Sequence, residues 1–159
     1  MRRGSGCVGS TLFFGIFFAV GVGISIYGWT VLQNGRDSEN WPSTQGQIVN
    51  SAVRVSSDED GTTYHADVTF DYVVNDHRYT GDEVSFGQYG SSNRNHAREI
   101  VARYASGTGV LVYYNPEQSQ TAVLEPGVTW SSFFILGMGL CFSIIPSIGI
   151  PLRTLSRRR

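Results

Sequence analysis

Two long stretches of this sequence, 4–33 and 126–152, contain no charged residue. Each exceeds the ~20 apolar residues that an α-helix needs to cross ~30 Å of hydrocarbon. All acidic residues lie between the two stretches, and the segments outside them carry only arginine as a charged residue. Because positively charged flanks resist translocation, this arrangement predicts two transmembrane helices, with both termini in the cytoplasm and the middle segment exported.

The charge pattern predicts a multi-pass protein of the plasma (inner) membrane. An alternative for the first stretch is a cleaved signal peptide behind Arg2 and Arg3, but the apolar run continues to Leu32, beyond the usual length of a signal core. The predicted parts are a cytoplasmic tail (1–6), a first transmembrane helix (7–32), an extracytoplasmic β-rich domain (33–126), a second transmembrane helix (127–152) and a basic cytoplasmic tail (153–159).

Aromatic and small residues mark specific positions in the two predicted helices. Tyr27, Trp29 and Trp130 stand near the outer ends, where aromatic side chains anchor helices at the membrane interface. Small residues recur every fourth position, which lets another helix backbone approach closely. We expect the chain's two helices to pack on each other first, with self-association or a membrane-protein partner as further uses. The predicted packing residues are Gly15, Ala19 and Gly23 in the first helix and Gly139, Ser143 and Ser147 in the second.

The middle segment has the pattern of a small α+β domain. Apolar and polar residues alternate over 64–74, which is typical of a strand with one buried face. A helix is expected after a cap at Ser92 or Asn93, with Gly107 beyond its end. The order β-β-β-α-β-β predicts a closed or half-closed antiparallel barrel, possibly OB-like, and an antiparallel sheet with the helix on one face is the alternative. The expected strands are 47–55, 64–74, 77–86, 110–114 and 121–124.

Charge and residue spacing argue against several functional classes. The middle segment holds all thirteen carboxylates of the chain, so its acidic balance argues against binding nucleic acid. His65, His77 and His96 lack the spacing of metal ligands. Asp67 and Asp71 share a strand face with backbones ~13 Å apart, too far for the carboxylate pair of a glycosidase. We therefore expect no enzyme, no cofactor and no metal.

Several short motifs together resemble the domain of unknown function 3592 family, which comprises mostly bacterial membrane proteins. The resemblance implies an exported β-rich domain between two membrane spans, and it brings no established catalytic residues. The motifs that carry it are Trp41-Pro42, Gly46-Gln47-Ile48, the hairpin from Tyr72 to Tyr79, the segment from Gly109 to Pro116 and the segment from Ala122 to Gly127.

Three functions are compatible with these features. The first is a non-catalytic interaction module of the membrane, such as an accessory subunit that displays an acidic β-domain close to the bilayer. The second is an envelope sensor that binds a glycan or peptide through aromatics such as Tyr64, Tyr79 or Tyr113. The third, a membrane-tethered hydrolase, requires a pair of titratable side chains within hydrogen-bond reach. The absence of catalytic groupings favours the first.

Overall fold

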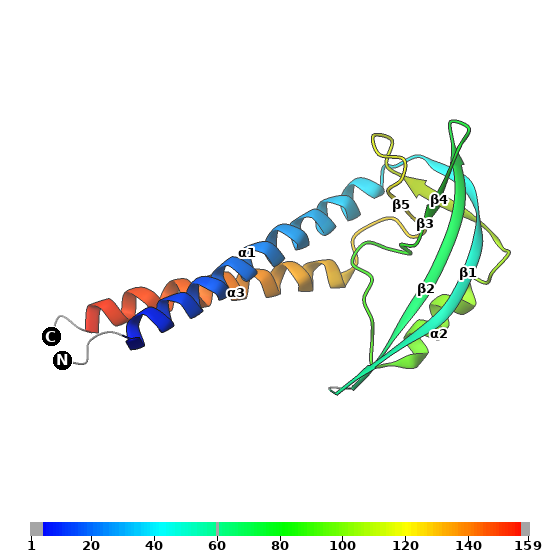
Figure 1. The fold of residues 1–159 in the computed structure, drawn as a ribbon. Coiled ribbons are helices and arrows are strands. Elements are labelled where there is room, and N and C mark those ends of the chain that lie inside the picture. Colours follow the sequence, from blue (N-terminus) through cyan, green and yellow to red (C-terminus); the bar gives the residue numbers. More distant parts are fainter. Residues whose placement is uncertain (1–4, 60, 157–159) are drawn as a thin grey trace. The chain divides into compact units, whose positions relative to one another are not determined.

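The computed structural model describes the backbone of residues 5–59 and 61–156, and the side chains of 15–59 and 61–144. The chain forms two compact units. One unit comprises Met1–Leu32 and Ser132–Arg159, and the other comprises Gln33–Ser131. The first is built from most of α1 (Ser5–Ser38) and most of α3 (Trp130–Ser156), and the second contains the five strands (Figure 1).

The spans were predicted over 7–32 and 127–152, and each of these ranges overlaps one long helix. α1 ends at Ser38, and α3 begins at Trp130. Within the described side chains, one helical segment is long and apolar enough to cross a membrane, Gly15–Ser38, with a mean hydropathy of 1.8. The apolar segment described in α3, Trp130–Ile144, is shorter, and the rest of the predicted second span lies outside the described side chains.

The second unit is an α+β fold in the predicted order β-β-β-α-β-β. Its sheet has the strand order β3-β2-β1-β4-β5, and each neighbouring pair is antiparallel. The helix α2 packs against β1 and β2. Asn93 caps this helix, because its side chain accepts a hydrogen bond from the backbone N–H of Asn95. The elements are β1 (Ser43–Asp58), β2 (Gly61–Val74), β3 (His77–Gly81), α2 (Arg94–Arg103), β4 (Gly109–Tyr114) and β5 (Ala122–Val123).

The sheet is open, so the predicted barrel is wrong and the alternative of an antiparallel sheet with a helix is confirmed. The outer strands are too short to close a barrel, because β3 has 5 residues and β5 has 2. The predicted third strand was expected to reach residue 86. Instead it ends at Gly81, and the chain bends so that Val84 and Phe86 are buried.

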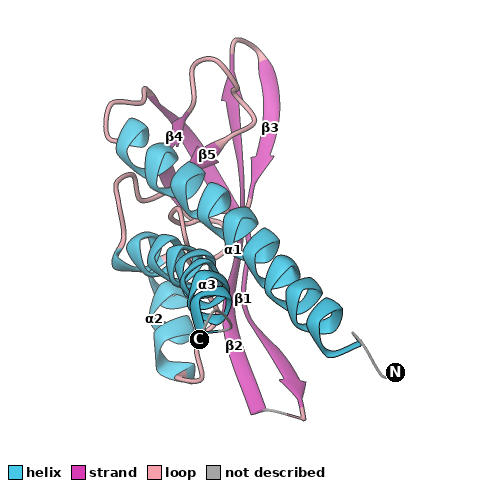
Figure 2. Ribbon diagram, turned by 90° about the vertical axis from the view of Figure 1, so that its left-hand side faces the viewer, coloured by secondary structure: helices cyan, strands magenta, loops and turns pink. Residues whose placement is uncertain are grey.

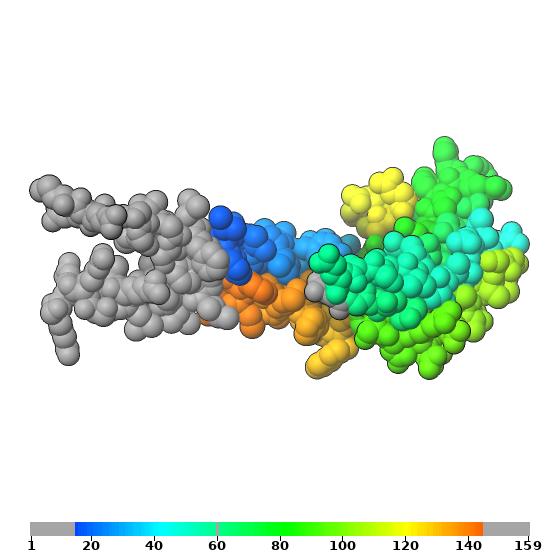
Figure 3. All heavy atoms as spheres, turned by 60° about the horizontal axis from the view of Figure 1, so that its bottom comes forward, coloured from blue at the N-terminus to red at the C-terminus, as the bar shows by residue number. Residues whose placement is uncertain are grey.

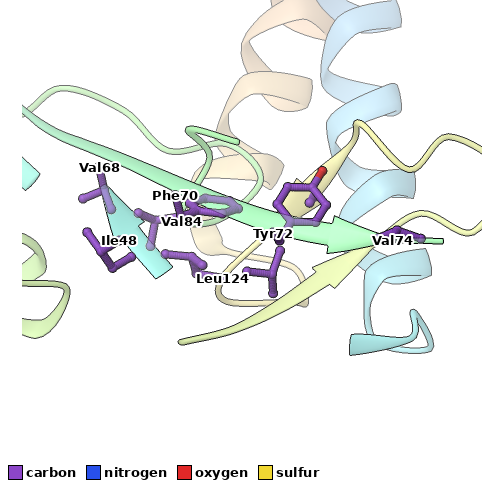
Figure 4. Packing of buried hydrophobic residues seen from close by; sticks show 9 residues of the cluster. Ile48, Val68, Phe70, Tyr72, Val74, Val84 and Leu124 are labelled. Carbon is purple, nitrogen blue, oxygen red and sulfur yellow. The ribbon is translucent and has the colours of Figure 1, made fainter. Parts of the chain in front are cut away.

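The core lies on one face of this sheet. Alternate residues of β2 from Ala66 to Val74 are buried, as the period-2 pattern predicts, and Val68 and Phe70 have no exposed surface. Ile48 of β1 lies in the same layer (Figure 4), and Val112 of β4 belongs to the same cluster. Burial of apolar side chains of this size contributes roughly 1.5–3 kcal/mol each, so the alternating strand supplies much of the stability of the unit.

The hairpin between β2 and β3 has a tight two-residue turn. Asn75 and Asp76 both have positive φ, 51° and 64°, between the paired residues Val74 and His77. Positive φ at both central residues is the type I′ geometry, whose twist matches that of the flanking strands. Asn and Asp tolerate this backbone region better than most other side chains, which explains how the turn forms without glycine.

Candidate functional site

The closest approach of α1 and α3 occurs at small residues. A methyl group on Gly21 would lie 2.7 Å from backbone atoms of Phe142 and Ser143, and one on Gly28 would lie 2.8 Å from the backbone of Leu136. A methyl group on Gly139 would lie 2.5 Å from the backbone nitrogen of Ser25. The described parts of the two helices pack side by side (Figure 3). We call the set Gly21, Ser25, Gly28, Leu136, Gly139 and Ser143 the helix seam.

The sequence-predicted packing residues divide between two environments. Gly139 and Ser143 belong to the helix seam. Gly15 and Gly23 have no other atom within 4 Å of a methyl group placed on them, and Ala19 is exposed. Among the side chains that the structure describes, the α1 stripe of Gly15, Ala19 and Gly23 therefore does not contact α3. Ser147 lies outside the described side chains.

Rotation around the helix explains why the seam uses other glycines. At about 100° per residue, Gly21, Ser25 and Gly28 lie roughly 150° from the centre of the α1 stripe. Both sets have small residues at helical spacing, so periodicity alone does not show which set contacts α3. Only the contacts with α3, and no local sequence pattern, distinguish the seam from the stripe.

Large apolar side chains are exposed along α1 between Ile16 and Ile26. Ile16, Phe18 and Val20 are about half exposed, and Ile26 is 63% exposed. In a soluble protein such a surface would be an interaction patch, whereas in a bilayer it faces acyl chains. The predicted interfacial anchors Tyr27, Trp29 and Trp130 are also exposed, with Trp130 at 85%.

The two aspartates on the exposed face of β2, Asp67 and Asp71, make ordinary surface contacts. Asp67 lies 4.0 Å from the Arg54 guanidinium, and Asp71 accepts a hydrogen bond of 2.7 Å from Thr80 Oγ1. Within residues 15–59 and 61–144, no group of three His, Cys, Asp or Glu side chains is arranged to hold a metal ion. An exposed ion pair of this kind contributes about 0–1 kcal/mol, so the Arg54–Asp67 contact adds little to the stability of the sheet.

A polar cluster that the sequence did not reveal joins α2 to the segment after β5. Glu125 Oε1 accepts hydrogen bonds from the Arg103 guanidinium and from Tyr104 Oη, the latter at 2.8 Å. Burial, reinforced by the hydrogen bond to Glu125, raises the pKa of Tyr104 to about 12. The hydrogen bond to Glu125 also raises the pKa of Arg103. Tyr104 and Arg103 therefore keep their protons at neutral pH, and the cluster fastens α2 to the segment after β5.

The aromatic residues considered as ligand contacts do not share one site. Tyr64 pairs with Val55 and Tyr113 pairs with Ser43, at opposite ends of β1. At ~3.3 Å per residue these partners are roughly 40 Å apart along the strand. Tyr79 stacks on Tyr72, with ring centroids 5.7 Å apart.

Tyr72 itself serves the fold. Its hydroxyl donates a 2.6 Å hydrogen bond to the Ser119 carbonyl. Burial, with a smaller contribution from Tyr79, raises the pKa of Tyr72 to about 12. A phenol that stays protonated through the physiological range keeps donating this hydrogen bond, which holds the loop before β5 against the core.

In a comparison with protein families, the model of Domain of unknown function (DUF3592) matches residues 44–129. The match begins in β1 and ends just before α3, so it covers nearly the whole sheet, α2 and the loops between them. Among curated proteins, none matches the sequence.

Proposed function

The chain belongs to the DUF3592 family, and we propose that it is a non-catalytic interaction module of the plasma (inner) membrane. In this proposal α1 and α3 both cross the bilayer, the arginine-bearing termini stay in the cytoplasm, and the β-domain lies outside, close to the membrane surface. The protein acts as an accessory subunit of a larger membrane assembly.

The observation that carries the proposal is the α1 stripe. In the described part of the chain, no other atom lies within 4 Å of a methyl group placed on Gly15 or Gly23, whereas Gly21 and Gly28 are in close contact with α3. A helix that pairs through one glycine face and leaves a second small-residue face uncovered can bind another helix without breaking the first pair. The apolar side chains flanking the stripe are consistent with a bilayer setting.

The charge distribution supports the proposed topology. The six arginines of the two terminal segments would need to cross the membrane if the termini were exported, and all carboxylates lie in the middle segment. Flanking arginine disfavours that export.

Association through the α1 stripe can be tested by gentle detergent extraction followed by native mass spectrometry. We expect the wild-type chain to be recovered in a complex, and Gly15→Leu with Gly23→Leu to reduce that complex at least about tenfold, because leucine at both positions blocks close helix approach. Gly137→Leu is the matched control, since Gly137 of α3 also has no other atom within 4 Å of an added methyl. A wild-type chain that is monomeric and free of partners would contradict the proposal.

A further inference from the structure

One long edge of β1 is open to solvent. β4 pairs with β1 only over Ser43–Gln47. Next along β1, the backbone of Ile48 forms hydrogen bonds with the backbone of Gly107 and Thr108. Beyond this point β1 continues to Asp58, paired with β2 alone among the described residues. β1 and β2 therefore form a two-stranded arm (Figure 2).

The opposite edge of the arm is partly covered. Tyr64 of β2 exchanges two backbone hydrogen bonds with Ser91, of 2.8 and 3.0 Å. The carbonyl of Ala66 accepts a 2.8 Å hydrogen bond from Gln88 Nε2. These contacts occupy the edge of β2 that β3 does not reach, so the β1 edge is the unprotected side of the arm.

The contacts of Tyr64 determine which backbone groups β1 presents at its open edge. In an antiparallel ladder, two residues that lie opposite each other form one of two kinds of pair. Either both direct their backbone N–H and C=O groups toward the partner strand, or both direct these groups away from it. Tyr64 directs its groups away from β1, to Ser91, so its partner Val55 directs its own groups to the open edge. The same alternation applies to Val53 and Ser57. In the described part of the chain, no backbone hydrogen bond outside the β1–β2 ladder reaches these three residues.

We propose that this edge pairs with the same edge of a second copy of the chain, antiparallel and centred on Ser56. In this register Val55 of one copy exchanges backbone hydrogen bonds with Ser57 of the other. Arg54 lies directly opposite Asp58 of the second copy, and the two-fold symmetry produces this pair twice. Opposite charges directly across an antiparallel pair stabilise it.

Charge and hydrogen-bond alternation together select this register. Registers centred on a single residue satisfy the ladder, because they pair outward-pointing residues with each other. Three of them, centred on Arg54, Val55 and Ser56, place Arg54 opposite a residue between Arg54 and Asp58, the last residue of β1. The register centred on Arg54 sets two arginines against each other. The one centred on Val55 sets Arg54 opposite a serine. Of these three, the Ser56 register is the one that pairs each arginine with a carboxylate, next to the Asp67 that Arg54 already contacts within its own chain.

Charge reversal in the full-length chain tests the pairing. By sedimentation in detergent micelles, we expect Arg54→Asp and Asp58→Arg each to weaken the dimer at least about tenfold, because each creates two like-charge pairs. The double variant restores both pairs with exchanged signs and should regain the dimer.

The matched control is Arg78→Asp, a reversal on β3. The proposal is supported if the dimer is lost in both single variants and returns in the double variant. A monomeric wild type, or a dimer unchanged by the single reversals, overturns it.

The register is tested by disulfide formation in a chain whose Cys7 and Cys141 are replaced by serine. Ser56→Cys should cross-link two copies under mild oxidation, since the residue at the two-fold faces its own copy. Val55→Cys cross-linking faster than Ser56→Cys would overturn the register. The outcome is independent of the helix-based proposal, because Gly23→Leu should leave this cross-link unchanged.

Discussion

Single glycine positions determine how closely the elements of this protein approach one another. Gly46 of β1 illustrates this in the β-domain, because a methyl group there would lie 2.6 Å from Val112 Cγ2 and 2.8 Å from the Asp71 carbonyl oxygen. Both neighbours belong to adjacent strands, and the Asp71 oxygen is part of the backbone. The position therefore excludes a side chain that would be acceptable elsewhere in a strand.

Gly46→Ala is expected to destabilise the β-domain by about 1–3 kcal/mol, as overpacking in a filled core does. The measurement is thermal unfolding followed by circular dichroism in detergent. Gly109→Ala is the matched control in β4, since its nearest neighbour atom would lie 3.9 Å away. Equal unfolding temperatures for the two variants would show that the sheet adjusts at Gly46 without cost.

Among the elements, the two long helices show how one helix can present two different small-residue faces. The helix seam brings α1 and α3 together, and the stacked rings of Phe17 and Phe142, with centroids 6.1 Å apart, extend the contact. Because lipid provides no hydrophobic force between helices, packing at such close contacts is a main source of association.

Gly28→Val should separate the helix pair, because its branched side chain would meet the backbone of Leu136. Spin labels at Ile26→Cys and Phe133→Cys, in a chain without its native cysteines, would report a longer and broader distance distribution. Gly23→Val places the same side chain in open space and should leave the distribution unchanged. A shift of equal size in both variants would mean that the seam does not hold the pair.

For the whole molecule, the defining property is the separation of an apolar helical part from an acidic β-domain along one chain. The helical part holds a segment with the length and composition of a membrane span, and the β-domain buries its own hydrophobic core. The proposed topology places these parts in different solvents, which predicts different chemical accessibility for their residues.

Cysteine labelling in intact cells measures that topology. In a chain whose native cysteines are replaced, Gln120→Cys, at an exposed position of the β-domain, should react with a membrane-impermeant maleimide added outside. Thr154→Cys, in the predicted cytoplasmic tail, should react only after permeabilisation. The reverse pattern would place residues 41–125 in the cytosol and contradict the exported orientation.

Local patterns in the sequence were sufficient to predict the elements. The alternation over 64–74 predicted β2 and its buried face, and Asn93 was one of the two predicted caps of α2. The uncharged stretch at the N-terminus predicted an apolar helix. These features depend on periodicity and capping, which act within a few residues of each other.

Other features required the tertiary structure because they depend on contacts between distant residues. Whether the sheet closes depended on β3 and β5, which are too short, and their lengths follow from where the chain bends into the core. The choice of Gly21 and Gly28 over Gly15 and Gly23 depended on the rotation of α1 toward α3. The sequence by itself thus determined which segments are helix, strand and apolar surface. Only the tertiary structure decided which faces and edges are covered, because coverage depends on register and rotation between segments far apart in the chain.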